Sequence, residues 1–399
     1  MSNFLSSEIV LAAEEGSVDN VLQLLQQGAS PNAIGANSGA LHAAAFMGHK
    51  AVVKALLKHG GDPNIKDKQN FYPLHLAASE GHTAICNLLL KAGANKEALT
   101  TSGGTALHIA AASNFAATVV ALIKGGCDKE AKDLDGSTPL LTASALGNEG
   151  VVKSLLKSGA DIKATNHKGN NALMQALWTL HAARIEQWEY EDVKDEVPVR
   201  YEIKKGCLKY YYNYNKFAPK PGRIMTLKEQ RNVALQAWGA EQHLDYLNAL
   251  AVVKYLIKKG VDVNQTDRRA ISPLRVACYA GVGSIIKLLH HAGARFDALP
   301  WQHITQLHQV AGSGRLDGLQ TFFKLADAKD INARDANGWT PAHYLADTGG
   351  PLEMADLLIK HGADVSILST AATQNFPQGI SAGKVAMHWK DLDLAMALA

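Results

Sequence analysis

The sequence predicts an all-α repeat solenoid, in which short helix pairs stack side by side. Three observations support this fold class. A tetrapeptide recurs at a spacing of 33 residues, glycines recur at two further positions in the same register, and each period holds two short apolar stretches. Repeats of this length indicate an architecture built from one supersecondary unit, because each unit buries its apolar face only against its neighbours.

The recurring tetrapeptide marks the start of the first helix of each repeat. Thr or Ser at its first position caps free backbone N–H groups, and Pro at its second position loses no hydrogen bond in the first helical turn. The copies form two runs. The last residue of the first run, Met174, and the equivalent residue of the next copy, Arg275, are 101 residues apart, which is one period of 33 plus an insertion of 68. The first run is Gly39–His42, Tyr72–His75, Thr105–His108, Thr138–Leu141 and Asn171–Met174, and the second is Ser272–Arg275, Thr305–His308, Thr340–His343 and a degenerate Ser381–Lys384.

Glycines are expected to end both helices of a repeat. A glycine such as Gly48 lies six residues beyond the last position of six of the tetrapeptides, and Asn114 replaces it once. Both residue types tolerate the left-handed conformation that ends a helix. The second apolar stretch, such as 52–57, is followed by a second glycine, here Gly60. Short polar segments between repeats, such as 133–136, predict tight β-hairpin turns.

The period and the Thr-Pro-Leu-His signature resemble the ankyrin repeat over nearly all of the chain except the insertion. The resemblance implies about ten repeats with their caps, β-hairpin connections and a concave binding surface. It also implies that the tetrapeptide histidines bond neighbouring backbone; these are His42, His75, His108, His308 and His343. Some family members are hydroxylated at a connection asparagine, and the matching positions here are Asn32, Asn64, Asn264 and Asn332.

The insertion divides the chain into an N-terminal array at 1–177, an inserted lobe at 178–245 and a C-terminal array at 246–399. It interrupts a repeat between its two helices, where a surface connection tolerates growth. The lobe is predicted to hold a helix extension, a β-hairpin over 197–214 and a further helix after a capping box. Candidate contact residues in the hairpin are Tyr201, Tyr210, Tyr211, Tyr212 and Tyr214.

The lobe admits more than one interpretation. Residues 200–231 carry nine Lys or Arg against two Glu, and basic residues interleaved with aromatic ones bind single-stranded nucleic acid or acidic peptides. In the alternative that the sequence favours, the aromatic residues pack on Trp178 and Trp188 while the lysines are solvated. A catalytic lobe is the weakest reading, because no nucleophile and base are paired there.

The resemblance also implies where a partner binds. The family's contact surface comprises first-helix positions one, four and five residues beyond the tetrapeptide, together with the connection tips. Here the helices carry Phe46, Met47, Glu80, Trp178 and Tyr279, and the tips carry Phe71, Tyr72, Lys132, His167, Arg268, Arg269 and Trp339. Large aromatic residues and arginine dominate recognition hot spots. We therefore expect a non-enzymatic scaffold that binds another protein, as a regulatory adaptor or a bacterial effector.

Composition and motifs argue against several classes of function. The net charge of +3 is too small to attract nucleic acid by itself, and no apolar run approaches the ~20 residues that span a bilayer. Four widely spaced cysteines suggest neither a disulfide framework nor a zinc site, and nucleotide-binding and hydrolase motifs are absent. We expect no cofactor, no metal and no membrane insertion. A monomer is favoured, in the cytoplasm or, for an effector, in a host cytosol.

Overall fold

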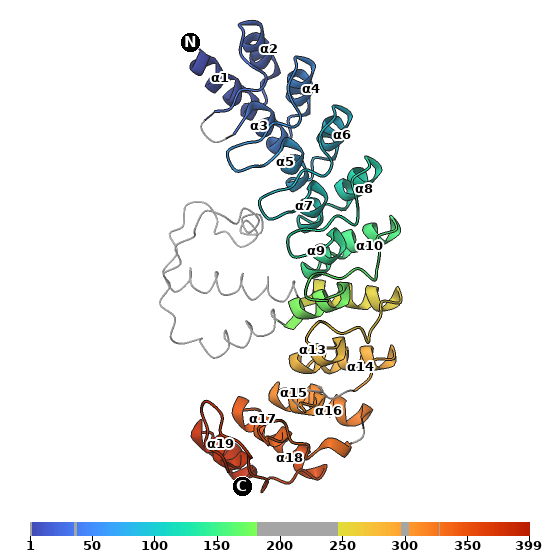
Figure 1. Ribbon diagram of the computed structural model, residues 1–399, viewed down its shortest axis with the longest axis vertical. Helices are drawn as coiled ribbons and strands as arrows, with labels where there is room; N and C mark the ends of the chain where they lie inside the picture. The colour runs from blue at the N-terminus through green and yellow to red at the C-terminus, as the bar shows by residue number, and fades with distance from the viewer. Residues whose placement is uncertain (1, 36–37, 182–245, 297–302, 327) are drawn as a thin grey trace, which may run out of the picture. The chain divides into compact units, whose positions relative to one another are not determined.

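The computed structural model describes residues 2–35, 38–181, 246–296, 303–326 and 328–399. In these ranges the chain forms short paired α-helices joined by turns (Figure 1), and the single β pairing is an isolated bridge between Ile34 and Gly39. The predicted all-α repeat solenoid is therefore confirmed. The predicted β-hairpin of the insertion and its five tyrosines lie outside the described residues. Most of the predicted lobe at 178–245 also lies outside them.

The chain divides into two compact units, Met1–Gln175 with Lys258–Asp262 and Ala176–Ile257 with Val263–Ala399, called here the first and the second unit. In the first unit, the odd-numbered helices α1 to α9 pack in succession, and the even-numbered helices α2 to α10 form a second layer beside them (Figure 1). The bounds are α1 Ser2–Glu15, α2 Val18–Gln26, α3 Ala40–Met47, α4 Lys50–Lys58, α5 Pro73–Ser79, α6 Thr83–Lys91, α7 Ala106–Ala112, α8 Ala116–Lys124, α9 Pro139–Ala145 and α10 Glu149–Lys157.

The second unit repeats this two-layer arrangement. Helices α13, α15, α17 and α19 pack in succession, and α14, α16, α18 and α20 form the other layer. Their bounds are α13 Pro273–Ala280, α14 Gly283–His291, α15 Gln306–Gly312, α16 Leu316–Leu325, α17 Pro341–Thr348, α18 Leu352–Lys360, α19 Ala382–His388 and α20 Leu392–Ala397, with a 3-10 turn η2 at Ala328–Asp330. The interrupted repeat contributes helical residues 172–181 and 246–258. No described helix is long and apolar enough to cross a bilayer.

The tetrapeptide histidines join successive repeats, as the resemblance implied. The backbone N–H of Thr105 donates to Nδ1 of His108 (3.2 Å), so the proton on Nε2 is donated to the Ser137 carbonyl of the next repeat (2.9 Å). Burial lowers the pKa of His108, which keeps the ring neutral in this role. The equivalent bonds to a carbonyl run from His42 to Phe71 (3.1 Å), His75 to Ala98 (2.9 Å), His308 to Trp339 (3.0 Å) and His343 to Ile380 (3.1 Å).

The connection asparagines form a second link between repeats. The side-chain amide of Asn64 donates to the Gly93 carbonyl (3.0 Å), and its Oδ1 accepts from the backbone N–H of Asn95 (2.6 Å). Asn32, Asn264 and Asn332 make the same two bonds. Glu97 takes this position in the next repeat, and its carboxylate accepts from the Asp128 N–H (2.8 Å). An amide carries both a donor and an acceptor, so it suits a position between two backbone groups.

The predicted helix ends are also present. Gly48 adopts φ 84° after α3, and a Cβ there would lie 2.6 Å from Cε1 of His82, so both conformation and space require glycine. Asn114 takes the same left-handed conformation, with φ 62°. The core between the layers is made of leucine, valine and alanine, and Leu56, Leu107 and Leu155 have no exposed surface.

Candidate functional site

The predicted contact residues of the first unit are spread over several repeats. Phe46 is half-buried and Met47 is 48 % exposed at the end of α3, while Glu80, Lys132 and His167 are exposed farther along. Phe71 and Tyr72 are half-buried and pack edge-on against His75, with ring centroids 6.2 and 5.3 Å away. These residues supply contact area without forming one pocket.

In the second unit, three predicted residues come together with one that sequence reasoning missed. We call Trp178, His181, Arg269 and Tyr279 the Trp178 cluster. The His181 ring lies edge-on to Trp178 (5.8 Å between centroids) and to Tyr279 (6.0 Å), and the guanidinium of Arg269 lies 6.0 Å from the Trp178 ring. The cluster joins the end of an interrupted first helix, a connection and α13. The available signal for His181 was its position three residues after Trp178 on the same helix.

The connection before α13 holds Arg269 in place. Asp267 is buried, and its Oδ1 accepts the backbone N–H groups of Arg269 and Ile271, both at 2.9 Å. Its Oδ2 pairs with Nε of Arg269 at 3.2 Å, although the arginine side chain stays 65 % exposed. The fixed turn therefore presents a cation beside the aromatic rings. Arg268 is exposed on the same turn.

His181 adds a ring that is neutral and accessible in part. Burial lowers its pKa, and its Nδ1 has no hydrogen-bond partner among the described residues. A neutral imidazole offers one donor and one acceptor. Tyr279 is 46 % exposed, so the cluster presents aromatic surface and a cation together, whereas Nδ1 of His181 is buried.

Trp339 requires a correction. The sequence placed it among the contact residues on or near the connection tips, but its side chain is only 7 % exposed. Its backbone N–H bonds Oδ1 of Asp335 (2.8 Å), and the closed turn directs the indole against Tyr344 and Phe376, whose ring centroids lie 6.0 and 5.7 Å away. Replacing it by alanine should therefore cost about 3–5 kcal/mol of stability and would not isolate a partner contact.

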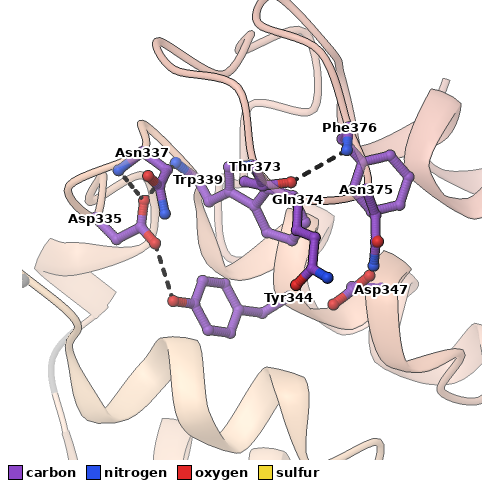
Figure 2. A pocket seen from close by; sticks show the side chains of 9 residues that line it. All are labelled: Asp335, Asn337, Trp339, Tyr344, Asp347, Thr373, Gln374, Asn375 and Phe376. Carbon is purple, nitrogen blue, oxygen red and sulfur yellow. Dashed lines mark hydrogen bonds between the residues drawn. The ribbon is translucent and has the colours of Figure 1, made fainter.

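Trp339 instead forms part of a pocket of about 280 Å³ (Figure 2). The pocket is lined by the turn Asp335–Trp339, by Tyr344 and Asp347 of α17, and by the segment 373–376. Tyr344 donates its hydroxyl proton to Oδ2 of Asp335 (2.9 Å), and burial, followed by the charge of Asp335, raises the Tyr344 pKa. The long connection 363–381 that closes the pocket has no counterpart in other repeats, so the sequence pattern gave no signal for it.

The described residues offer little for metal or nucleophilic chemistry. They contain no group of three or more His, Cys, Asp or Glu arranged to hold a metal ion. Cys86, Cys127 and Cys278 are buried, and burial raises the pKa of Cys86 and Cys127 to about 12, so their thiols stay protonated. The fourth cysteine, Cys207, lies outside the described residues.

Comparison with known proteins identifies the repeat. A family model described as ankyrin repeats in three copies matches residues 9–100, 107–185 and 274–369, which together exceed half of the chain. The chain is similar to alpha-latrotoxin-Lhe1a of Latrodectus hesperus, with 30% identity over 92 residues, and to inversin of Mus musculus, with 29% identity over 134 residues. It is also 42% identical over 66 residues to an ankyrin repeat-containing protein of Schizosaccharomyces pombe.

These similarities cover only parts of each protein. The matches span 23%, 34% and 16% of this chain, in the same order. They span 6% of the toxin, 12% of inversin and 32% of the yeast protein. What is shared is therefore the repeat itself.

Proposed function

The chain belongs to the ankyrin repeat family, whose repeats are generally protein-interaction modules, and we propose from this premise that it is a scaffold that binds a partner protein through the Trp178 cluster. The finer assignments, to a regulatory adaptor or an effector, to a monomer and to the cytoplasm or a host cytosol, stay predictions. The proposed role uses binding surface and needs no catalytic group.

The observation that supports this site is the size of the residues at one repeat position. Four residues beyond the tetrapeptide, the chain places the small residues Ser79, Ala112, Ala145 and Gly312 in four repeats, and Phe46, Asp347 and His388 in three others. At the same position it places Trp178 in the interrupted repeat and Tyr279 in the repeat that follows it. Stacking does not require these large side chains, because small residues serve elsewhere, and aromatic residues beside arginine are typical of interface hot spots.

The cluster favours a partner that presents an acidic side chain next to an apolar one. Arg269 keeps most of its guanidinium surface exposed although Asp267 pairs with one nitrogen, so its remaining N–H groups can bind a carboxylate. Tyr279 and Trp178 supply the neighbouring apolar surface. An exposed charge pair also orients the partner and accelerates association.

The proposal is tested by replacing Arg269 and Tyr279 with alanine in the full chain. Both side chains are exposed, so the variant should keep its thermal unfolding midpoint within about 2 °C. Partners captured by the wild-type chain under cross-linking would be identified, and their affinities measured by titration calorimetry. We expect a loss of at least about tenfold, the level of a moderate hot spot.

A matched control removes similar groups from the other layer of the same unit. Lys287→Ala with Ile359→Ala deletes one exposed cation on α14 and one apolar side chain that is 42 % exposed on α18. This variant should bind like the wild type. If the control loses affinity and the Arg269/Tyr279 variant does not, the binding surface lies on the second helices and the proposal is wrong.

The basic, tyrosine-rich insertion remains the alternative, as a contact for single-stranded nucleic acid. Its residues lie outside the described ranges, so its support is the sequence alone. Fluorescence anisotropy with a labelled single-stranded oligonucleotide separates the two functions. Nucleic-acid binding through this segment would weaken steeply with added salt and vanish on deleting 189–231. The Arg269/Tyr279 variant would leave it unchanged.

A further inference from the structure

We infer that the pocket between the turn Asp335–Trp339 and the segment 373–376 binds an arginine side chain of a partner protein. The inference rests on the proposed function, since it names a chemical feature of the partner, but it concerns different residues. Figure 2 shows the acidic groups Asp335 and Asp347 at opposite sides of the lining, with Trp339 and Tyr344 between them.

The first reason is charge. Asp335 is only 9 % exposed, and its oxygens accept two backbone N–H groups and the Tyr344 hydroxyl, all of them neutral donors. In the described part of the chain, neither Asp335 nor Asp347 has an ion-pair partner, and neither Arg275 nor Arg334 lines the pocket. Asp335 therefore has hydrogen-bond donors but no direct ion pair within the described ranges, and a positively charged ligand group would complement its charge.

The second reason is the shape of the walls. The rings of Trp339, Tyr344 and Phe376 lie side by side; the Trp339 plane is 87° from that of Tyr344 and 53° from that of Phe376. Trp339 and Phe376 are 7 % and 4 % exposed, so the half-buried Tyr344 is the ring on which a planar guanidinium can stack while its edge reaches carboxylates. A lysine ammonium is a compact, strongly hydrated charge and gains less from aromatic walls.

The third reason is the supply of acceptors at the mouth. Asp347 is exposed, and its Oδ1 accepts Nε1–H of Trp389 at 3.2 Å, a contact that positions the carboxylate. The side-chain amides of Gln374 and Asn375 are exposed beside it. A guanidinium carries five N–H donors, and these carboxylate and amide oxygens can accept several of them together.

The test uses the full chain and a minimal probe, Nα-acetyl-arginine methylamide, which carries the side chain and two peptide carbonyls. Its neutral analogue, Nα-acetyl-citrulline methylamide, has nearly the same shape without the charge. Indole N–H resonances of Trp339 and Trp389, assigned with single Trp→Phe variants, are followed by NMR during titration. We expect saturable shifts with the arginine probe at millimolar concentration, and none that saturate with the citrulline probe.

Asp347→Asn gives the matched variant, because the amide keeps the size of the side chain and an acceptor for Trp389. It should weaken the arginine probe about three- to fivefold. Asp356→Asn makes the same change in charge on an exposed residue of α18 outside the pocket and should bind like the wild type. Equal shifts from both probes, equal affinity of a lysine probe, or no effect of Asp347→Asn would each overturn the assignment.

The outcome is separate from that of the proposed function, because the titration needs no partner protein. If the Arg269/Tyr279 variant keeps its partner while the arginine probe binds as described, the Trp178 cluster is the wrong surface and the pocket stands. If the probe fails while the cluster variant loses its partner, the pocket assignment alone is wrong.

Discussion

The two compact units use the same repeat for different ends. In the first unit, tetrapeptides follow at an unbroken 33-residue spacing, histidine links His42, His75 and His108 join repeats, and most first helices end in small residues. In the second unit the spacing from His308 to His343 is 35 residues, and a long connection at 363–381 closes a pocket. Regular repeats provide the stacking contacts. Segments that depart from the repeat, such as the connection 363–381, form a pocket that stacking does not need.

The contrast is clearest at the fourth tetrapeptide position. Arg275 stands there in the second unit and is 1 % exposed, while its backbone N–H keeps the usual cap on Oγ of Ser272 (3.3 Å). Its Nη2 donates to the Ile304 carbonyl, which is the role that Nε2 of His108 plays in the first unit. The arginine therefore preserves the link between repeats and places a permanent charge within the stack.

The largest expected effect comes from removing one core leucine in each unit. Leu107 and Leu307 occupy the same repeat position and are 0 % and 1 % exposed. Each Leu→Ala change should cost about 2–5 kcal/mol, because it deletes buried methyl groups and leaves a cavity. Hydrogen exchange resolved by peptide should show the loss mainly around α5 to α9 for Leu107→Ala and around α13 to α17 for Leu307→Ala.

If Leu107→Ala and Leu307→Ala give the same pattern of hydrogen exchange, the comparison between the two units fails. Equal loss of protection in every repeat would mean that the chain unfolds as a single cooperative body. The contrast between the units would then concern their surfaces and not their stability.

A smaller effect is expected at Arg275. Arg275→Ala should cost about 2–4 kcal/mol, since it removes the bond to the Ile304 carbonyl and leaves a cavity. Arg275→His should cost less, because an imidazole makes the equivalent bond in other repeats. Urea unfolding measures both free energies. If the histidine variant is no more stable than the alanine variant, Arg275 stabilises the unit through its charge and not through the link between repeats.

The smallest effect is a dependence on pH that the two units share. Burial lowers the pKa of His42, His75 and His108 in the first unit and of His181, His308 and His343 in the second. These rings are neutral when folded and bind protons on unfolding, so their contribution to stability is present above about pH 6.5 and is lost as pH falls through the lowered values. Each contributes at most about 1.4 kcal/mol per pH unit.

We therefore expect the free energy of unfolding to fall below pH 6.5 in both units, since three such histidines lie among the described residues of each. Exchange measured at pH 7.5 and 5.5 checks this. His108→Asn provides the control, since it should be less stable at pH 7.5 but show a shallower dependence on pH. A first unit that is more stable at pH 5.5 would contradict the assignment of neutral, buried imidazoles.

The candidate site was predictable in part. The repeat register placed Trp178, Arg269 and Tyr279 on one surface, because equivalent positions in stacked repeats face the same side. Register gave no information on His181, which lies beyond the repeated positions, or on the burial of Trp339. That burial depends on Phe376, 37 residues later, and the connection carrying Phe376 follows no repeat pattern.

By itself the sequence determined the periodic part of this protein, namely helix starts, glycine ends, and the histidine and asparagine links, since each depends on residues a fixed spacing apart. The tertiary structure alone decided which irregular segments meet. Asp335, Asp347 and the segment 373–376 form one pocket because a connection of unusual length folds back over the preceding turn. Such long-range closure depends on packing and loop conformation, which local propensity does not encode.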